Sequence, residues 1–149
     1  MTESQTPPGG YILDELSPGM SAELHVDITE ERILRFAEAS GDFNPLHIDE
    51  AYAQASPYRG RVAHGLLSAS FVSAVVGTIL PGPGAIYLGQ TLSFHKPVRI
   101  GDRVTARVTV ATIDPGSARV TLRTECLVDG EPVLEGEATI RVPRRRRRA

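Results

Sequence analysis

The longest apolar stretch of the chain limits its fold more than any other feature. Residues 66–80 read LLSASFVSAVVGTIL, and PGPG follows at 81–84. At helical spacing the apolar side chains fall on every side, so a helix here has to be covered by protein or by lipid. Its 15 residues would span about 22 Å, which is shorter than the roughly 30 Å hydrocarbon core of a membrane. The segment therefore predicts a buried helix that begins at Gly65 and is enclosed by a folded domain.

The chain after Gly84 changes to a period of two. Apolar and polar residues alternate over 85–96, 103–110, 118–126 and 134–142. Alternation of this kind is typical of antiparallel strands with one buried face and one wet face. Turn residues separate the segments, and the two-residue Asp129-Gly130 connection favours a type I′ hairpin. Four strands are therefore expected in this half, with a further short strand over 22–27.

Two helices are expected between residues 28 and 55. Thr29 is a candidate N-cap, and Glu30 and Glu31 follow it in the first turn, where the helix dipole favours negative charge. Ser40-Gly41 predicts the end of this helix, because glycine readily takes the left-handed conformation. Asp49 can cap a second, short helix.

These elements together predict an α+β fold in which a curved antiparallel sheet wraps around the long helix. The sheet would bury its inner face on that helix. Its edge strands would still expose unpaired backbone N–H and C=O groups, which favours a homodimer that joins two sheets.

The length and composition of the chain predict its domain boundaries and its cellular compartment. At 149 residues the chain fits one domain, and the start MTESQTPPGG resembles a short disordered leader with no secretory signal. The expected division is a leader over 1–10, a folded domain over 11–143 and a disordered tail over 144–149. The single cysteine, Cys126, rules out an internal disulfide and makes a reducing cytoplasm the expected location.

The tail has an unusual charge. Residues 144–148 are five consecutive arginines, and removing them would take the net charge of the chain from −2 to −7. Such a run repels itself and is expected to be a solvated tail. The alternative is a tether to phosphate groups or nucleic acid, but no zinc-finger spacing or RNA-binding signature accompanies it, so a nucleic-acid partner is not expected.

The stretch SGDFNPLHID, residues 40–49, carries the first candidate site. Pro45 disfavours the helical conformation at Asn44, and the Asn side chain can stiffen the resulting loop by bonding nearby backbone. Asp42 and His47 would then lie at the two ends of one loop, and their side chains would converge without touching. This arrangement suits two bases that bind one water molecule between them. The alternative is a helix-capping Asp and a surface His. Metal ligands are not predicted, because the four histidines show no i, i+4 pair.

The second candidate site is RVAHGLLSAS, residues 61–70. Backbone N–H groups at the start of a helix have no intrahelical partner, and a glycine lets a ligand approach them closely. His64-Gly65 therefore predicts an oxyanion hole for a carbonyl that becomes an enolate. The alternatives are a plain turn for His64-Gly65 and, further along the helix, a back-bonded helix serine for Ser73.

The two motifs, followed by YLGQTLSFHKPVRIGD, closely resemble the MaoC-like, R-specific enoyl-CoA hydratase family. The likeness runs from about residue 12 to 143. It implies a hot-dog fold, a homodimer, and reversible syn hydration of a trans-2-enoyl-CoA to the (R)-3-hydroxyacyl-CoA, a hydro-lyase reaction of fatty acid metabolism. It implies no cofactor.

The resemblance also implies the roles of individual residues. Asp42 and His47 match the catalytic pair, and Gly65 matches the position whose amide binds the thioester oxygen. Asn44 matches a loop residue that positions the site, Ser73 a helix serine that supports the aspartate, and His64 stands beside them. The implied partner is an acyl-CoA thioester, with an acyl-carrier-protein thioester as the alternative.

Two other functions are open at this point. A hot-dog acyl-CoA thioesterase could use the same helix end, although it would aim water at C1 rather than C3. A non-catalytic acyl-CoA-binding subunit of a heterodimeric dehydratase would be expected to lose Asp42 or His47, and the chain has both.

Overall fold

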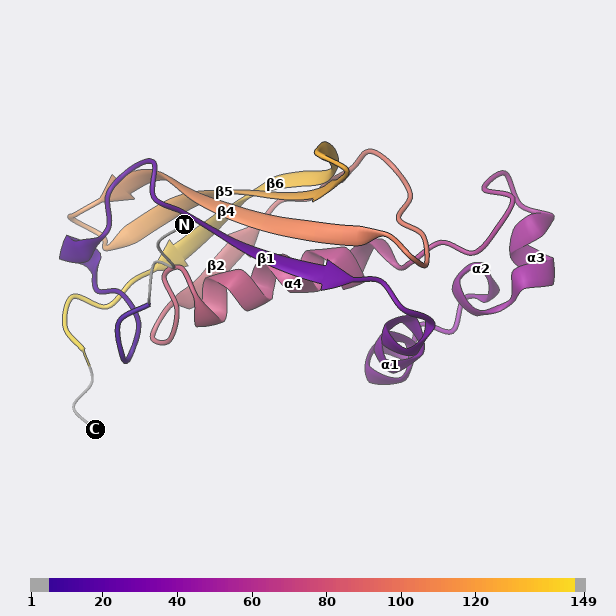
Figure 1. The fold of residues 1–149 in the computed structure, drawn as a ribbon. Coiled ribbons are helices and arrows are strands. Elements are labelled where there is room, and N and C mark those ends of the chain that lie inside the picture. Colours follow the sequence, from indigo (N-terminus) through magenta and orange to yellow (C-terminus); the bar gives the residue numbers. More distant parts are fainter. Residues whose placement is uncertain (1–5, 147–149) are drawn as a thin grey trace.

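The computed structural model describes residues 6–146, and residues 1–5 and 147–149 lie outside this description. Its elements (Figure 1) are η1 (Leu13–Glu15), β1 (Ser21–Asp27), α1 (Glu30–Ser40), α2 (Pro45–Ile48), α3 (Glu50–Gln54), α4 (Gly65–Thr78), β2 (Ile86–Gln90), β3 (Ser93–Phe94), β4 (Arg103–Asp114), β5 (Arg119–Val128) and β6 (Glu131–Arg141). The predicted strand over 22–27, both predicted helices and the helix from Gly65 are all present.

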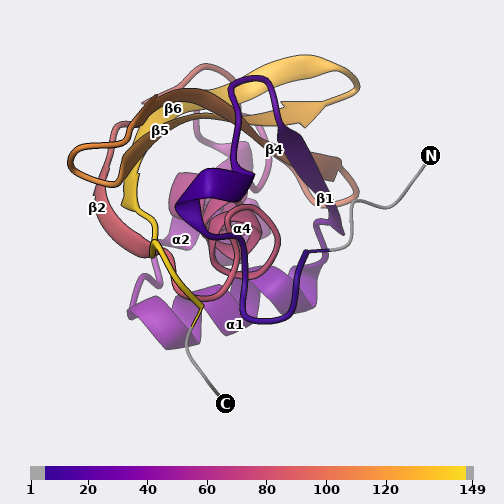
Figure 2. The ribbon, with the colours of Figure 1, turned by 90° about the vertical axis from the view of Figure 1, so that its left-hand side faces the viewer.

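The strands form one antiparallel sheet around α4, as predicted. Their order is β1-β4-β5-β6-β2, and β3 pairs with β6. Figure 2 shows the sheet curving around α4, with α1 on the opposite side of that helix. The hairpin between β5 and β6 has positive φ angles at Asp129 (52°) and Gly130 (77°), which a type I′ turn requires.

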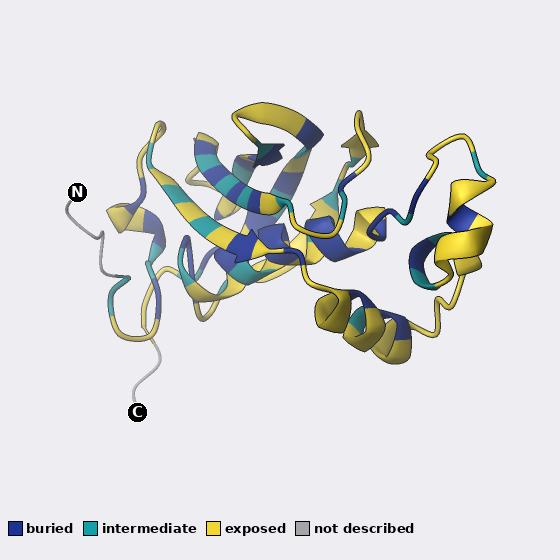
Figure 3. Cartoon of the chain, turned by 45° about the vertical axis from the view of Figure 1, so that its right-hand side comes forward, coloured by how far each residue is buried: buried dark blue, intermediate teal, exposed yellow. Residues whose placement is uncertain are grey.

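The predicted alternation is confirmed in the three central strands. Their inward side chains are at most 1% exposed: Val104, Ala106, Val108 and Val110 in β4, Val120, Leu122, Thr124 and Cys126 in β5, and Leu134, Ala138 and Ile140 in β6. Buried residues consequently alternate with intermediate or exposed ones along much of β4 and β5, as the banded strands of Figure 3 show. The core of the protein is the layer between these side chains and α4.

Helix α4 is enclosed on one side only, which corrects the expectation of complete cover. Leu67, Ser68, Phe71, Val72, Val75 and Val76 are buried. Leu66, Ser70, Ser73 and Gly77 are exposed. The sheet of a single chain covers the first group, and nothing in the described part of the chain covers the second.

The predicted strand over 85–96 is broken into β2 and β3, and its predicted buried face is wrong. Ile86, Leu88 and Phe94 are all exposed. The register of β2 against β6 shifts between Tyr87 and Gly89. A bulge of this kind bends an edge strand and rotates its side chains, which alternation in the sequence does not reveal.

The described ends of the chain contact the domain. Thr6 donates its hydroxyl to the carbonyl of Ile79 at 2.7 Å, and Arg144 donates to the carbonyl of Pro115 at 2.6 Å. Arg146 forms an ion pair with Glu15. Part of the expected leader and tail is therefore bound to the domain, while the rest lies in the residues that are not described. Within residues 6–146, no helix combines the length and apolarity needed to cross a membrane.

The connection between β2 and β3 passes directly over Gly136 and generates a stability prediction. A Cβ atom at position 136 would lie 1.8 Å from the carbonyl oxygen of Thr91, so a side chain there has to displace backbone. We expect Gly136→Ala to lower the free energy of unfolding by about 1–3 kcal/mol, measured by urea denaturation.

Gly77 provides the matched control for this substitution. It lies in α4, and a Cβ atom there meets nothing within 4 Å. Gly77→Ala should therefore leave stability unchanged or raise it by up to about 1 kcal/mol, because glycine disfavours a helix interior. Equal unfolding free energies for the two variants would contradict the crossing over Gly136.

Candidate active site

The end of α1 places Asp42 at the site. Gly41 ends the helix in the left-handed conformation, with a φ of 81°, and its N–H donates to the carbonyl of Ala37 at 2.8 Å. The hydroxyl of Ser40 then accepts the N–H of Asp42 at 3.1 Å. These bonds turn the chain sharply after α1, so that Asp42 follows the helix directly.

Asn44 and Pro45 start a short helix rather than a loop, which corrects the expected conformation around His47. The Oδ1 atom of Asn44 accepts the N–H of Leu46 at 3.0 Å, and Pro45 occupies the first helical position of α2. Proline is favoured there because its missing N–H would have had no intrahelical acceptor. The N–H of Asn44 also donates to Oδ1 of Asp42 at 3.1 Å. Asn44 thus positions both candidate catalytic residues.

His47 is buried, and its orientation is set by its hydrogen bonds. Nδ1 lies 2.7 Å from the carbonyl oxygen of Val62. A carbonyl only accepts hydrogen bonds, so Nδ1 carries the proton and Nε2 carries the lone pair in the neutral ring. The Nε atom of Arg61 donates to the carbonyl of His47 at 2.8 Å and fixes the end of α2. The free lone pair makes His47 a candidate base through Nε2.

His64 supports both of these residues from the start of α4. Its Nε2 donates to the backbone carbonyl of Asp42 at 2.9 Å, and its ring stacks on His47 with 3.8 Å between centroids. Burial lowers the pKa of His64; the carbonyl of Asp42 opposes this change and the neighbouring His47 adds to it. A neutral His64 beside His47 avoids repulsion when His47 takes up a proton.

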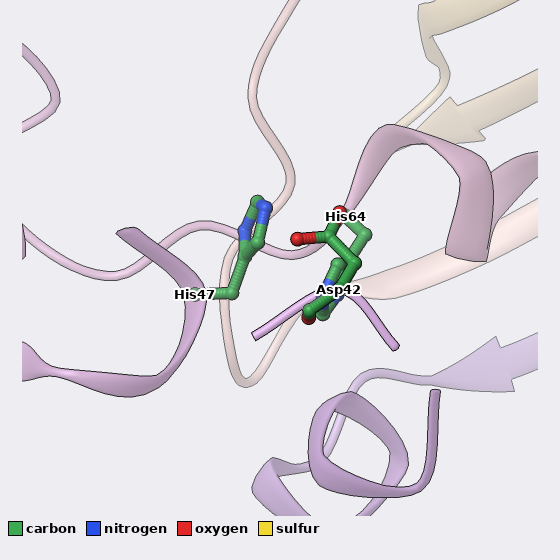
Figure 4. A group of neighbouring side chains, drawn as sticks. All are labelled: Asp42, His47 and His64. Carbon is green, nitrogen blue, oxygen red and sulfur yellow. The ribbon is translucent and has the colours of Figure 1, made fainter. Parts of the chain in front are cut away.

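The three side chains converge on one point (Figure 4). A candidate ligand atom from each of Asp42, His47 and His64 lies within 4.8 Å of the other two, and a carboxylate oxygen of Asp42 points toward the ring of His47. No hydrogen bond joins the Asp42 carboxylate to His47 among the described residues. One carboxylate and two imidazoles are also a donor set that Zn²⁺ accepts, and the spacing in the sequence did not reveal this grouping.

A cavity of about 510 Å³ opens beside these residues. Its volume is in the range of small-molecule sites. Besides the three converging residues, its walls include Tyr58, Gly65, Ser68, Phe94, Lys96 and Leu134. The acid/base candidates and the start of α4 therefore face the same space.

Gly65 is the first residue of α4 and lies on the wall of this cavity. Its N–H has no hydrogen-bond acceptor among residues 6–146. A Cβ atom at this position would lie 2.6 Å from the ring of Phe94, so only glycine allows the ring to pack this closely. The amide is therefore available to a ligand, in the position predicted for an oxyanion hole.

Ser73 is not brought to the cavity. It is exposed on α4 and lies eight residues beyond Gly65, a distance of about 12 Å along the axis. Among the described residues, the serine that lines the cavity is Ser68. It was not predicted as a site residue, although its i+3 spacing from Gly65 places it on the same helix face. Arg61 was also missed, since no local pattern indicates its bond to His47.

Comparison with known proteins agrees with this geometry. A family model described as a MaoC-like domain matches residues 15–130. An (R)-specific enoyl-CoA hydratase of Rhodospirillum rubrum is 53% identical over 135 residues, which cover 91% of this chain and 94% of that protein. A 3-hydroxybutyryl-CoA dehydratase of Methylorubrum extorquens is 46% identical over 132 residues, with coverages of 89% and 84%.

Solved structures give the same family and the hot-dog fold. The unliganded R-hydratase of Pseudomonas aeruginosa superposes with a TM-score of 0.86 at 42% identity, covering 91% of this chain and 88% of that one. The (R)-hydratase of Aeromonas caviae has a TM-score of 0.83 at 40% identity, with coverages of 86% and 98%. This chain belongs to the MaoC-like family.

Proposed function

We propose that this chain is an (R)-specific enoyl-CoA hydratase, a hydro-lyase that interconverts trans-2-enoyl-CoA and (R)-3-hydroxyacyl-CoA. The observation that carries the proposal is the convergence of Asp42 and His47 on a cavity that also meets the free amide of Gly65. The similar proteins from R. rubrum, P. aeruginosa and A. caviae are named as R-hydratases, which supports the same reaction here. The proposed domain is residues 11–143.

The proposed reaction begins with a water molecule held between the Asp42 carboxylate and Nε2 of His47. Nε2 takes a proton from this water as the oxygen attacks C3 of the enoyl thioester, while Asp42 accepts the second hydrogen bond of the water and orients it. General base catalysis of this kind contributes about 10²–10⁴-fold. The π electrons of the alkene move toward the thioester carbonyl and form an enolate.

The enolate is stabilised at the start of α4 in this proposal. The amide of Gly65 donates to the thioester oxygen, and the positive end of the helix dipole favours the negative charge. The imidazolium of His47 then returns its proton to C2, on the face from which the water added, which gives syn addition. The proton taken from water thus ends on C2 of the product, and the hydroxyl group ends on C3.

The substrate and assembly belong to the same proposal. The thioester is carried by CoA, with an acyl-carrier protein as the alternative carrier, and the compartment is the cytoplasm. The chain forms a homodimer, because Ile86, Tyr87 and Leu88 are exposed on the outer edge strand β2. Unpaired edge strands are suited to pairing with another chain.

The first test removes each acid/base group. Asp42→Asn and His47→Gln should each lower kcat for hydration of crotonyl-CoA by about 10²–10⁴-fold, because the water loses its base or its orienting carboxylate. Loss of the enoyl absorbance, with the chirality of the product checked, measures the rate.

Asp129→Asn and His25→Gln are the matched controls. Both residues are exposed and lie in strands or turns away from the cavity. They should retain wild-type kcat. Near-wild-type hydration by both site variants would rule out the mechanism, and thiol release from saturated acyl-CoA without loss of enoyl absorbance would favour a thioesterase instead.

The second test concerns the amide of Gly65. Gly65→Ala brings its Cβ against Phe94 and shifts the first turn of α4. We expect kcat to fall by about 10²–10³-fold, the usual loss for one oxyanion donor. Gly65→Ala combined with Phe94→Ala removes the clash and should recover part of this loss. Full activity in the single variant would show that the amide is not used.

The assembly is tested by mass in solution. Sedimentation equilibrium should give twice the 16.1 kDa of one chain. A mass of 16.1 kDa at micromolar concentration, together with full activity, would contradict the homodimer.

A further inference from the structure

Ser68 is a buried polar residue on the cavity wall for which the mechanism above has no role. The residue is 2% exposed and lines the cavity together with Gly65. Its Oγ atom has no hydrogen-bond partner within the described part of the chain. Buried hydroxyls without a partner are rare in native proteins, and each one calls for an explanation, such as a ligand.

Neighbouring hydroxyls on α4 behave differently. Ser70 donates to the carbonyl of Leu67 at 2.5 Å, and Thr78 donates to the carbonyl of Ala74 at 2.6 Å. Back-bonding of this type is the ordinary use of a helix serine. Ser68 makes no such bond, and its own carbonyl accepts the thiol of Cys126 at 3.3 Å. The backbone of Ser68 is therefore anchored to β5, while its hydroxyl is left for another acceptor.

The helix geometry indicates where that acceptor would lie. Ser68 is three residues after Gly65, so both residues share one face of α4. Side chains on a helix lean toward its N-terminus and cover the preceding turn. The side chain of Ser68 therefore leans toward the first turn of α4, where the free amide of Gly65 lies.

We propose that Ser68 is a further catalytic residue, whose hydroxyl donates a second hydrogen bond to the thioester oxygen held by the amide of Gly65. The inference rests on the proposed hydratase function and deepens it, since the enolate oxygen then has two donors from adjacent turns of α4. The hydroxyl keeps its proton throughout, and no covalent step is involved.

Other polar groups on the cavity wall are less suited to this role. His64 donates through Nε2 to Asp42, so its Nδ1 is an acceptor and cannot bind a carbonyl oxygen. His95 and Lys96 are exposed and paired with Glu135 and Glu131. Among the described residues of the cavity wall, Ser68 is the buried side-chain donor whose hydrogen remains available.

The kinetic test uses Ser68→Ala, with Ser70→Ala as the matched control on the same helix. Ser68→Ala should lower kcat for crotonyl-CoA hydration by about 10²–10³-fold with little change in KM, because the second donor acts mainly on the developing charge. Ser68→Thr retains the hydroxyl and should restore at least part of the rate. Ser70→Ala, which removes a back-bonded and exposed hydroxyl, should retain wild-type kcat.

Two further readouts separate this role from a structural one. Ser68→Ala should leave the Tm unchanged or raise it, because it removes an unpartnered buried hydroxyl. In infrared difference spectra of bound butyryl-CoA labelled with ¹³C at the carbonyl, the wild-type protein should lower the C=O stretching frequency more than Ser68→Ala does. Butyryl-CoA has no alkene and is not hydrated, so this measurement does not depend on turnover.

The outcomes distinguish the inference from the function on which it rests. Failure of the wild-type protein to hydrate any enoyl-CoA would overturn the proposed function. Wild-type hydration with an unchanged kcat in Ser68→Ala would overturn the inference alone. A lower kcat with an unchanged carbonyl frequency would also overturn it, because the hydroxyl would then contact something other than the thioester.

Discussion

The packing of α4 into the concave face of the sheet is the interaction on which the rest of the structure depends. Six apolar or small side chains of α4 are buried against inward residues of the central strands. This packing fixes the N-terminus of the helix relative to β3, where Phe94 meets Gly65. The free amide that the proposed reaction uses is therefore held by the core of the protein rather than by a mobile loop, which is the kind of support a preorganised site requires.

The acid/base groups depend on a second set of local interactions. Gly41 ends α1, Asn44 caps α2, and the carbonyl of Val62 fixes the tautomer of His47. His64 ties the two ends together, since it stacks on His47 and donates to the backbone of Asp42. Backbone atoms thus orient the three titratable side chains, and the second carboxylate oxygen of Asp42 and Nε2 of His47 are left for a ligand.

The sequence predicted the parts of this structure that have strong local signals. Four predictions are confirmed: the Thr29 cap, the end of α1 at Gly41, the helix from Gly65 and the alternating central strands. Each of them has a local signal in the sequence, namely a capping residue, a glycine or a periodic pattern of apolar residues. The helix α2 was missed because Pro45 suits a helix start as well as a loop. Ser68 was overlooked although its i+3 spacing from Gly65 is visible in the sequence. The bond of Arg61 to His47 and the position of Ser73 outside the cavity depend instead on contacts between residues that are distant in the sequence. Periodicity does not encode such contacts.

The single cysteine has a consequence for how the protein tolerates oxidants. Cys126 is fully buried in β5, and burial raises the pKa of its thiol to about 12. The thiolate, which is the form that peroxides and alkylating agents attack, is therefore almost absent at physiological pH. The thiol also donates a hydrogen bond to the carbonyl of Ser68 in α4 at 3.3 Å. Alkylation or oxidation of Cys126 is therefore expected to require local separation of β5 from α4.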